Sequence, residues 1–294
     1  MKILLFGKNG QLGKSIAEEL RSRNIDFVAL SRDDIDITDY KALKKSFNEH
    51  KPNICINAVA YTDVDQSEVN TTYATKVNNI AVSEIAKNCS DFGSRLIHFS
   101  TDYVFDGTKD TPYTEKDEPN PLNHYGVSKL EGEKAIKTSG CSFTIIRTSW
   151  VFSEYRKNFL KTILNISKNA ERITVVHDQH GCPTYAKDIS KVVFQLISNK
   201  RFLNSESKIY HFCGNKCMSW YEFASHIVKA AHKIGYIDDV VVDPVQSKNI
   251  IDNKPNRPKY SALCPENIIK DFNLEFSDTI LAINKTVKNI THLS

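Results

Sequence analysis

The sequence predicts an α/β protein: a Rossmann-type, doubly wound parallel sheet with a smaller C-terminal α/β lobe. Three observations support this fold class. A short apolar run at the amino terminus leads into a glycine-rich turn at Gly7, Gly10 and Gly13. Strand patterns then alternate with helical patterns through the first half of the chain, which is typical of a parallel sheet covered on both faces. Finally, Tyr125 and Lys129 are spaced so that a helix would present both on one side.

Apolar periodicity assigns the elements in order. Strands are expected at residues 1–6, 27–30, 54–56, 96–99, 142–150, 173–176 and 209–212, and helices at 12–20, 40–47, 74–89, 158–166, 188–197, 221–231 and 280–287, with a further helix beginning near Tyr125. The proline-containing polar loop before Tyr125 is too long to be a simple connector. We expect a first domain at residues 1–147, to which the chain returns near 185–200, and a second lobe formed mainly by residues 148–294.

Composition narrows the class of protein. With 294 residues, 40% hydrophobic and 25% charged, the chain matches a globular protein, and no apolar run is long enough to span a membrane. The amino terminus is too short an apolar stretch for a signal peptide. A net charge of +4 without a dense basic block predicts no nucleic-acid partner, although it suits an anionic small substrate. Seven cysteines, mostly inside apolar runs, favour reduced thiols and a cytoplasmic location.

The glycine turn follows a strand and opens a helix. In that position glycines allow the backbone to approach a pyrophosphate at a helix N-terminus, so residues 1–147 are interpreted as a dinucleotide-binding domain. A phosphate loop of the NTPase kind is excluded, because it requires glycine where Lys8 stands before Gly13-Lys14-Ser15. A purely structural turn is the alternative.

The end of the second strand bears on the choice of dinucleotide. A carboxylate there holds the ribose hydroxyls of NAD, whereas an arginine accommodates the 2′-phosphate of NADP. This chain has Ser31 and Arg32, which favour NADP(H), while Asp33-Asp34 keep NAD(H) open. Asp36-Ile37 are expected at the adenine edge, with a solvated acidic loop as the alternative.

Thr101 ends the fourth predicted strand and is expected in the same crevice as Tyr125 and Lys129. Reduction of a carbonyl group needs a hydride on carbon and a proton on oxygen. Tyr125 would supply the proton, and the Thr101 hydroxyl would hydrogen-bond the same oxygen. Lys129 is expected to lower the pKa of Tyr125 as a neighbouring ammonium and to bond the nicotinamide ribose. A surface Tyr and Lys on an ordinary helix is the alternative.

Several motifs together resemble the extended short-chain dehydrogenase/reductases, and specifically the dTDP-4-dehydrorhamnose reductase family. The resemblance covers nearly the whole chain and runs through LLFGKNGQLG (4–13), INAVAYTDVDQSE (56–68), STDYVFDG (100–107), PLNHYGVSKLEGEKA (121–135), RTSWVF (147–152), DQHGCPTYA (178–186) and NRPKYSAL (256–263). The first and fourth motifs mark only the superfamily. The order STDYVF, RTSWVF and DQ-x-G-x-PT is far more selective.

The resemblance implies reduction of the C4 ketone of dTDP-4-dehydro-6-deoxy-L-mannose to dTDP-L-rhamnose by NADPH or NADH. It assigns the acid to Tyr125, with Thr101 and Lys129 as partners. Sugar contacts would come from Asp102, Tyr103 and Trp150, and a diphosphate contact from Arg257, with a core aromatic and a surface arginine as the alternatives for the last two. The implied cofactor contacts are Gly7, Asn9, Gly10, Gln11, Leu12, Gly13, Ser31, Arg32, Asp36, Ile37, Ala58, Ala60 and Thr62.

Departures from the family pattern are also informative. Some members bind Mg²⁺ through carboxylates at a dimer interface, but Ser15 and Lys187 stand at the corresponding positions here, so no metal is predicted. Four histidines near the motifs show no paired spacing on one helix face. The nucleotide-sugar substrate is the expected partner, and the protein is expected to be a monomer or a homodimer.

Three rival functions remain open. Related dehydratases have Asp-Glu after the catalytic threonine, whereas this chain has Asp102-Tyr103 and so lacks the elimination base. Epimerase-reductases place a cysteine where Asp102 stands, although Cys182 and His180 in a predicted substrate turn keep epimerisation open. A non-catalytic NADP-binding regulatory subunit is the rival from another class, and the intact Thr101, Tyr125 and Lys129 argue against it.

Overall fold

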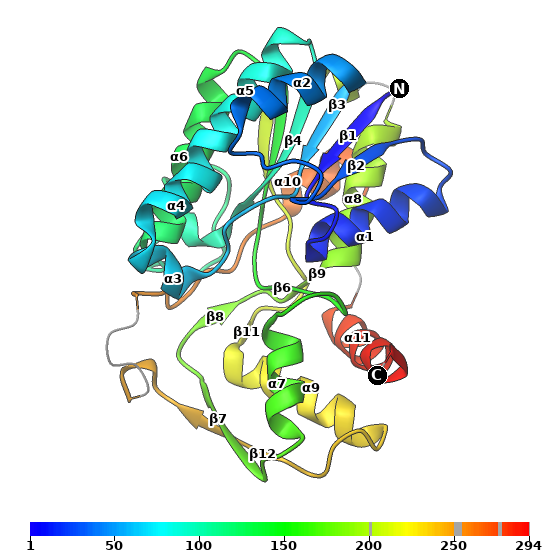
Figure 1. Ribbon diagram of the computed structural model, residues 1–294. Helices are drawn as coiled ribbons and strands as arrows, with labels where there is room; N and C mark the ends of the chain where they lie inside the picture. The colour runs from blue at the N-terminus through cyan, green and yellow to red at the C-terminus, as the bar shows by residue number, and fades with distance from the viewer. Residues whose placement is uncertain (200–201, 250–254, 276–277, 294) are drawn as a thin grey trace.

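A parallel sheet forms the larger part of the molecule in the computed structural model, which describes residues 1–199, 202–249, 255–275 and 278–293. Its six strands follow the order β10-β5-β4-β3-β1-β2, and all neighbours are parallel (Figure 1). The strands are β1 (Ile3–Phe6), β2 (Val28–Leu30), β3 (Ile54–Asn57), β4 (Arg95–Thr101), β5 (Phe143–Thr148) and β10 (Lys208–His211). This arrangement is the doubly wound Rossmann type that the sequence predicts.

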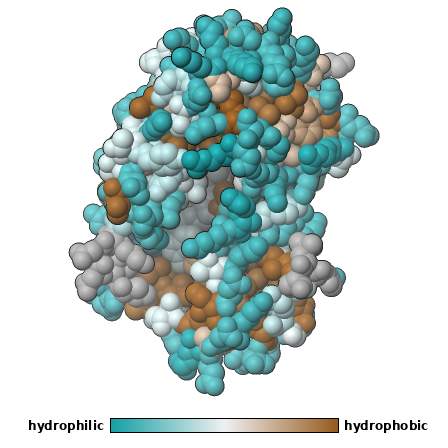
Figure 2. Space-filling model, viewed as in Figure 1, coloured by the Kyte–Doolittle hydropathy of each residue, from teal (hydrophilic) through white to brown (hydrophobic). Residues whose placement is uncertain are grey.

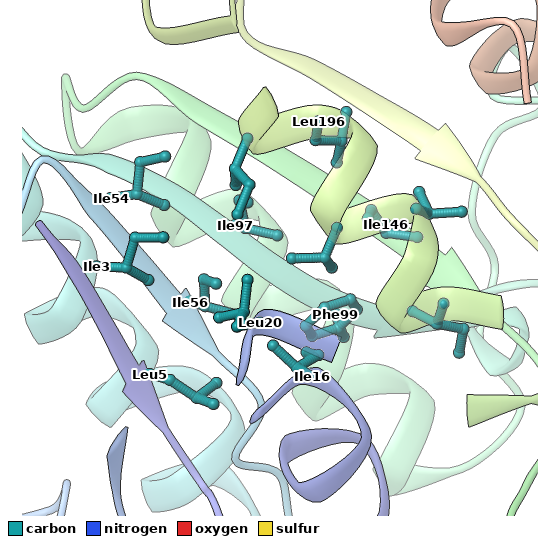
Figure 3. Close-up of a cluster of buried hydrophobic side chains, with 14 of the residues drawn as sticks. Ile3, Leu5, Ile16, Leu20, Ile54, Ile56, Ile97, Phe99, Ile146 and Leu196 are labelled. Carbon is teal, nitrogen blue, oxygen red and sulfur yellow. The ribbon is translucent and has the colours of Figure 1, made fainter. Parts of the chain in front are cut away.

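Helices cover both faces of the sheet because successive strand residues point to opposite sides. Ile3 and Leu5 pack on one face against α1 (Gln11–Ser22), α8 (Ala186–Ser198) and α10 (Glu266–Phe272). Figure 3 shows this apolar cluster, with Ile16 and Leu20 of α1 and Leu196 of α8 over the sheet residues. Leu4 and Phe6 pack on the other face, which is covered by α2 (Tyr40–His50), α5 (Ala81–Asp91) and α6 (His124–Thr138). A short helix α3 (Val64–Val69), α4 (Thr71–Thr75) and a π-helical turn (Lys76–Ile80) precede α5.

The smaller part of the molecule has its own apolar core below the sheet in Figure 1. The parallel pair β7 (Arg172–Val176) and β12 (Val241–Val245) packs there with α7 (Phe159–Ser167), α9 (Trp220–Lys233) and α11 (Thr279–Leu293). Two short pairs lie between this core and the sheet: β6 (Val151–Phe152) with β9 (Thr184–Tyr185), and β8 (His180–Gly181) with β11 (Met218–Ser219). Short 3₁₀ turns are η2 (Asp102–Val104), η3 (Phe202–Asn204) and η4 (Ser247–Asn249).

Several elements that follow residue 147 in the chain belong to the six-stranded sheet and its helices. Helix α8 packs along α1, β10 forms the edge strand beside β5, and α10 packs against β10. The sequence analysis did not anticipate α3, α10 or β12 because these segments are short and their apolar periodicity is weak. Each is stabilised by packing against elements distant in sequence.

The exposed surface is largely hydrophilic in the view of Figure 2, with a recess between the two parts of the molecule. Among the described helices, none combines the length and apolar character needed to cross a bilayer. All seven cysteines are free thiols, and five of them are buried.

Candidate active site

The glycine turn lies where the strand order reverses. Because β1 stands between β2 and β3, the loops that leave β1 and β3 diverge and open a crevice at the carboxyl edge of the sheet. Gly7 has a φ of 91°, and a Cβ atom there would lie 2.9 Å from the Ala58 carbonyl group. A Cβ atom on Gly13 would lie 2.0 Å from the Gly7 oxygen. Glycine at both positions therefore lets α1 begin close to the sheet, with its N-terminus facing the crevice.

A cavity of about 330 Å³ occupies this crevice. It is lined by predicted cofactor residues from three separate segments. These are Gly7, Asn9, Gly10, Ser31, Arg32, Asp36, Ile37, Ala58 and Ala60. The first amides of α1 have no intrahelical acceptor, so this lining fits the anionic, partly apolar character of a dinucleotide. Sequence reasoning missed Tyr61, although it lies within the motif at residues 56–68, and also missed Tyr73 and Arg156, which lie outside the quoted motifs.

Three predicted cofactor residues of the α1 N-terminus, Gln11, Leu12 and Gly13, do not line the first cavity. The Gln11 side-chain oxygen accepts hydrogen bonds from Ser153 Oγ and Asn158 Nδ2, both at 2.9 Å. Leu12 packs against the apolar core, and Gly13 contacts the glycine turn itself. These residues shape the helix N-terminus, and any contact with the cofactor would come from their backbone.

Two acidic residues after β2, Asp34 and Asp36, already bind local partners. Asp34 accepts hydrogen bonds from the Ser31 backbone N–H and hydroxyl group, both at 2.7 Å, and pairs with Lys8 at 2.7 Å. The Lys8 ammonium and these donors lower the pKa of Asp34. Asp36 caps the following turn through Thr38, at 2.9 Å from its N–H and 2.8 Å from its hydroxyl. Arg32 and Arg156 are exposed basic residues that line the cavity.

A second cavity of about 380 Å³ adjoins the first, because residues 58–64 line parts of both. All of the predicted catalytic and substrate residues except Lys129 line it, together with Thr62. The full lining is Thr62, Val64, Thr101, Asp102, Tyr103, Tyr125, Trp150, Phe159, Val175, Val176, Trp220 and Arg257. The structure thus gathers residues from β4, α6, α7, β7, α9 and the C-terminal segment at one place.

Helix α6 brings Tyr125 to the end of β4. Asn123 caps the helix by accepting a hydrogen bond from the Gly126 N–H at 2.9 Å. A Cβ atom on Gly126 would lie 2.1 Å from the backbone carbonyl oxygen of Tyr103, so glycine is required for α6 to approach the Tyr103 backbone this closely. The Tyr125 ring then contacts the Tyr103 ring edge-on, with centroids 5.9 Å apart. Burial raises the pKa of Tyr125 to about 12, although Thr101 partly opposes this effect by hydrogen bonding.

The predicted effect of Lys129 on Tyr125 is wrong for the cofactor-free chain. Lys129 Nζ donates to the Phe99 carbonyl oxygen at 2.7 Å and lies 3.3 Å from His98 Nε2. Burial lowers the pKa of Lys129 itself to about 8, whereas the pKa of Tyr125 rises. The physical reason is that desolvation of both side chains outweighs the attraction between an ammonium and a phenolate.

Two hydroxyl groups hold the carboxyl group of Asp102, a residue that lines the second cavity. Its carboxylate accepts hydrogen bonds from Ser261 Oγ at 2.6 Å and Thr101 Oγ1 at 3.1 Å. The Thr101 oxygen in turn accepts from the Tyr103 N–H at 3.1 Å. Burial raises the pKa of Asp102 to about 7 despite these donors. The C-terminal segment therefore reaches the end of β4 through Ser261.

Two tryptophans form one wall of the second cavity. Trp150 has a φ of 47°, an uncommon conformation for a bulky residue, and its indole stacks on Trp220 with centroids 3.4 Å apart. A Cβ atom on Gly181 would lie 2.5 Å from the Trp150 ring, so the indole is held between Gly181 and Trp220. Trp150 lines the cavity and also packs against the apolar core of the smaller part of the molecule.

Arg257 also lines the second cavity and pairs with Asp65 through Nη2 at 2.7 Å. Its Nε atom is buried and has no hydrogen-bond partner among the described residues. The side chain is a quarter exposed, so the alternative of a free surface arginine does not apply.

Other predicted or excluded features lie away from the cavities. Lys187 pairs with Glu154 at 2.6 Å, and the Ser15 hydroxyl donates to the Gln11 carbonyl oxygen. Within the described ranges no group of three potential metal ligands occurs. Cys182 is buried, and neither it nor His180 lines the second cavity, which weighs against the epimerisation alternative.

This fold, with the glycine turn at its switch point and Tyr125 beside Thr101, is that of an extended short-chain dehydrogenase/reductase. The family model for the RmlD substrate binding domain matches residues 1–292. A dTDP-4-dehydrorhamnose reductase from Aggregatibacter actinomycetemcomitans is 38% identical over 98% of both chains. The chain belongs to the dTDP-4-dehydrorhamnose reductase family.

Solved structures agree with this assignment. A dTDP-4-dehydrorhamnose reductase from Clostridium acetobutylicum superposes with a TM-score of 0.90 at 35% identity, over 99% of this chain and 100% of the other. The enzyme of the same name from Bacillus anthracis, solved in complex with NADP, gives a TM-score of 0.88 at 33% identity, over 98% and 99% of the two chains.

Proposed function

We propose that this protein reduces the C4 ketone of dTDP-4-dehydro-6-deoxy-L-mannose to dTDP-L-rhamnose with NADPH. The observation that carries the proposal is the second cavity, in which Thr101, Tyr125 and the predicted sugar contacts meet beside the segment that also lines the cofactor cavity. Relatives with the name dTDP-4-dehydrorhamnose reductase match almost the entire chain. The free thiols are in keeping with a cytoplasmic location.

NADPH would occupy the first cavity and supply the hydride to the sugar carbon. Arg32 is the group that would pair with a 2′-phosphate, because it lines the first cavity while Asp34 is already bound to Lys8 and Ser31. The N-terminus of α1 would face the pyrophosphate. The complex of the Bacillus anthracis relative with NADP supports this choice.

Tyr125 would donate the proton to the ketone oxygen. Its raised pKa of about 12 keeps the phenol protonated at neutral pH, as an acid in a reduction must be. Thr101 would hydrogen-bond the same oxygen and so stabilise the charge that develops on it. Lys129, one helical turn beyond Tyr125, would contact the nicotinamide ribose.

The nucleotide sugar would lie along the second cavity. The stacked Trp150 and Trp220 offer an apolar surface of the kind that sugar rings and bases pack against. Asp102, which also lines the cavity, offers the sugar a hydrogen-bond acceptor or donor. Arg257 has an unpaired Nε–H that would bind a diphosphate oxygen while Nη2 remains on Asp65.

The test is oxidation of NADPH by the purified chain, followed by its absorbance, with dTDP-, UDP- and GDP-linked 4-keto sugars in separate reactions. We expect turnover with the dTDP sugar and formation of dTDP-L-rhamnose in equal amount to NADP. Binding of NADPH without any oxidation would instead identify a non-catalytic subunit. Turnover of another sugar in place of the dTDP compound would contradict the proposed substrate.

A further inference from the structure

A buried chain of hydrogen-bonding groups runs from the sheet to Lys129. Asn57 at the end of β3 and His98 of β4 are cross-strand partners, and Lys129 reaches them from α6. All three side chains are at most 2% exposed. In a buried site each hydrogen-bond donor must face an acceptor, because no water is present to bind a donor or an acceptor that lacks a partner.

The orientation of the Asn57 amide is determined by the backbone. Its Oδ1 atom accepts a hydrogen bond from the Val59 N–H at 3.0 Å, so its Nδ2 atom is the group that faces His98 Nδ1, at 3.2 Å. An amide nitrogen is a donor only. His98 Nδ1 is therefore the acceptor, and a neutral His98 ring must carry its proton on Nε2.

His98 is neutral in this environment, since burial lowers the pKa of His98 well below its ordinary value. The Nε2–H consequently points at Lys129 Nζ, 3.3 Å away. An ammonium has no lone pair with which to accept this hydrogen bond, whereas a neutral amine has one and can still donate to the Phe99 oxygen at 2.7 Å.

The remaining charge near Lys129 does not reverse this preference. Glu133, one turn further along α6, favours the ammonium, but it is bound by Arg147 of β5 through two hydrogen bonds at 2.9 and 2.7 Å. Burial of the lysine acts in the same direction as His98 and lowers the pKa of Lys129.

We propose that His98 is a positioning residue which presents its Nε2–H to the Lys129 nitrogen and thereby favours the amine over the ammonium in the cofactor-free protein. Asn57 acts one step further away by selecting the His98 tautomer. The catalytic meaning of this arrangement rests on the proposed function, because the charge of Lys129 matters for reduction only if Tyr125 is the acid. The hydrogen-bond pattern itself does not depend on that function.

The tautomer is tested first, in the wild-type chain and without any ligand. Nitrogen-15 NMR of the histidine-labelled protein, with His98 assigned through its backbone resonances, should show a protonated Nε2 and an unprotonated Nδ1. A protonated Nδ1 would overturn the proposal. This measurement needs no variant to fold and no substrate to turn over.

The effect on Lys129 is tested with a matched pair of variants. His98→Asn keeps an acceptor for Asn57 but is too short to reach Lys129, whereas His98→Gln places an N–H close to the Nε2 position. Carbon-13 NMR of lysine-labelled protein, assigned with Lys129→Met, should show the Lys129 titration midpoint rising by about one pH unit in His98→Asn and staying near the wild-type value in His98→Gln. The same midpoint in all three proteins would refute the role of His98.

Kinetics separate this inference from the proposed function. If NADPH is not oxidised but the NMR results are as expected, the proposed function fails and the inference stands. If NADPH is oxidised, the alkaline limb of the kcat profile should shift in His98→Asn and be restored in His98→Gln.

Discussion

The indole of Trp150 lies on that of Trp220 with centroids 3.4 Å apart and an interplanar angle of 5°. The two residues come from different segments, one after β5 and the other at the first position of α9. A capping box, in which Ser219 and Glu222 bond each other's backbone N–H, fixes the start of α9 and hence the place of Trp220. The cavity wall thus depends on a helix cap.

Removal of this stack should weaken sugar binding selectively. Trp220→Ala is expected to raise the KM for the nucleotide sugar about tenfold, because an aromatic pair contributes roughly 0.5–1.5 kcal/mol beyond its buried area and Trp150 loses its support. Steady-state kinetics with NADPH at saturation measure this effect. Trp220→Phe, which retains an aromatic face, should recover most of the loss. An unchanged KM in the alanine variant would mean that the wall does not contact the sugar.

Tyr125→Phe should abolish proton donation and leave cofactor binding intact. We expect kcat to fall by about 10²–10⁴-fold, since general acid catalysis contributes an effect of that size. The Kd for NADPH, measured by fluorescence titration, should stay within about twofold of the wild-type value. Parallel losses in kcat and in NADPH affinity would contradict the role assigned to the phenol.

Arg32→Ala should remove the preference for NADPH over NADH. Loss of a charge-assisted contact with the 2′-phosphate is worth about 1.5–3 kcal/mol, so the KM for NADPH should rise by roughly 10–100-fold while that for NADH changes little. Arg23→Ala is the matched control, because Arg23 pairs with Glu19 on the exposed side of α1. An equal effect of Arg32→Ala on both cofactors would disprove recognition of the 2′-phosphate.

Glu133 and Glu131 offer a comparison of a buried and an exposed ion pair on one helix. Glu133→Gln leaves Arg147 as an unpaired charge in a fully buried site, so the free energy of unfolding should fall by about 3–5 kcal/mol. Glu131→Gln breaks an exposed pair with Lys134 and should cost less than about 0.5 kcal/mol. Denaturant unfolding of both variants gives the two values. Similar small losses would show that the buried pair is not required for folding.

Asp102 should make stability fall as pH rises. Its carboxyl has an ordinary pKa of 3.8 in the unfolded chain and about 7 in the folded one, so between these values the native state binds more protons than the unfolded state. The associated stability is present near pH 4 and is lost as pH rises through about 7, by roughly 2–4 kcal/mol.

The measurement compares wild type with Asp102→Asn, whose side chain resembles the protonated carboxyl. The unfolding free energy of the wild type relative to the variant should fall by roughly 2–4 kcal/mol between about pH 4 and pH 8, since the other ionisable groups are shared. A difference that does not vary with pH would mean that Asp102 titrates normally.

The sequence by itself determined the elements of the sheet, the glycine turn and the family. Apolar periodicity is local, so α1, β3 and α8 lie close to their predicted bounds, and α6 begins next to Tyr125 as expected. The glycine turn could also be identified from the sequence, because Gly7, Gly10 and Gly13 follow a predicted strand and precede a predicted helix. In the structure, the backbone conformation of Gly7 and its contact with Ala58 require glycine.

Only the tertiary structure decided how these parts meet. Trp220 stacks on Trp150, and His98 Nε2 lies 3.3 Å from the Lys129 nitrogen. In both pairs the two residues come from segments far apart in the chain. The prediction that Lys129 lowers the pKa of Tyr125 failed for the same reason: sequence spacing showed that the two share a helix face, but not that burial desolvates both. Desolvation depends on everything packed around a group, and that is a property of the folded chain.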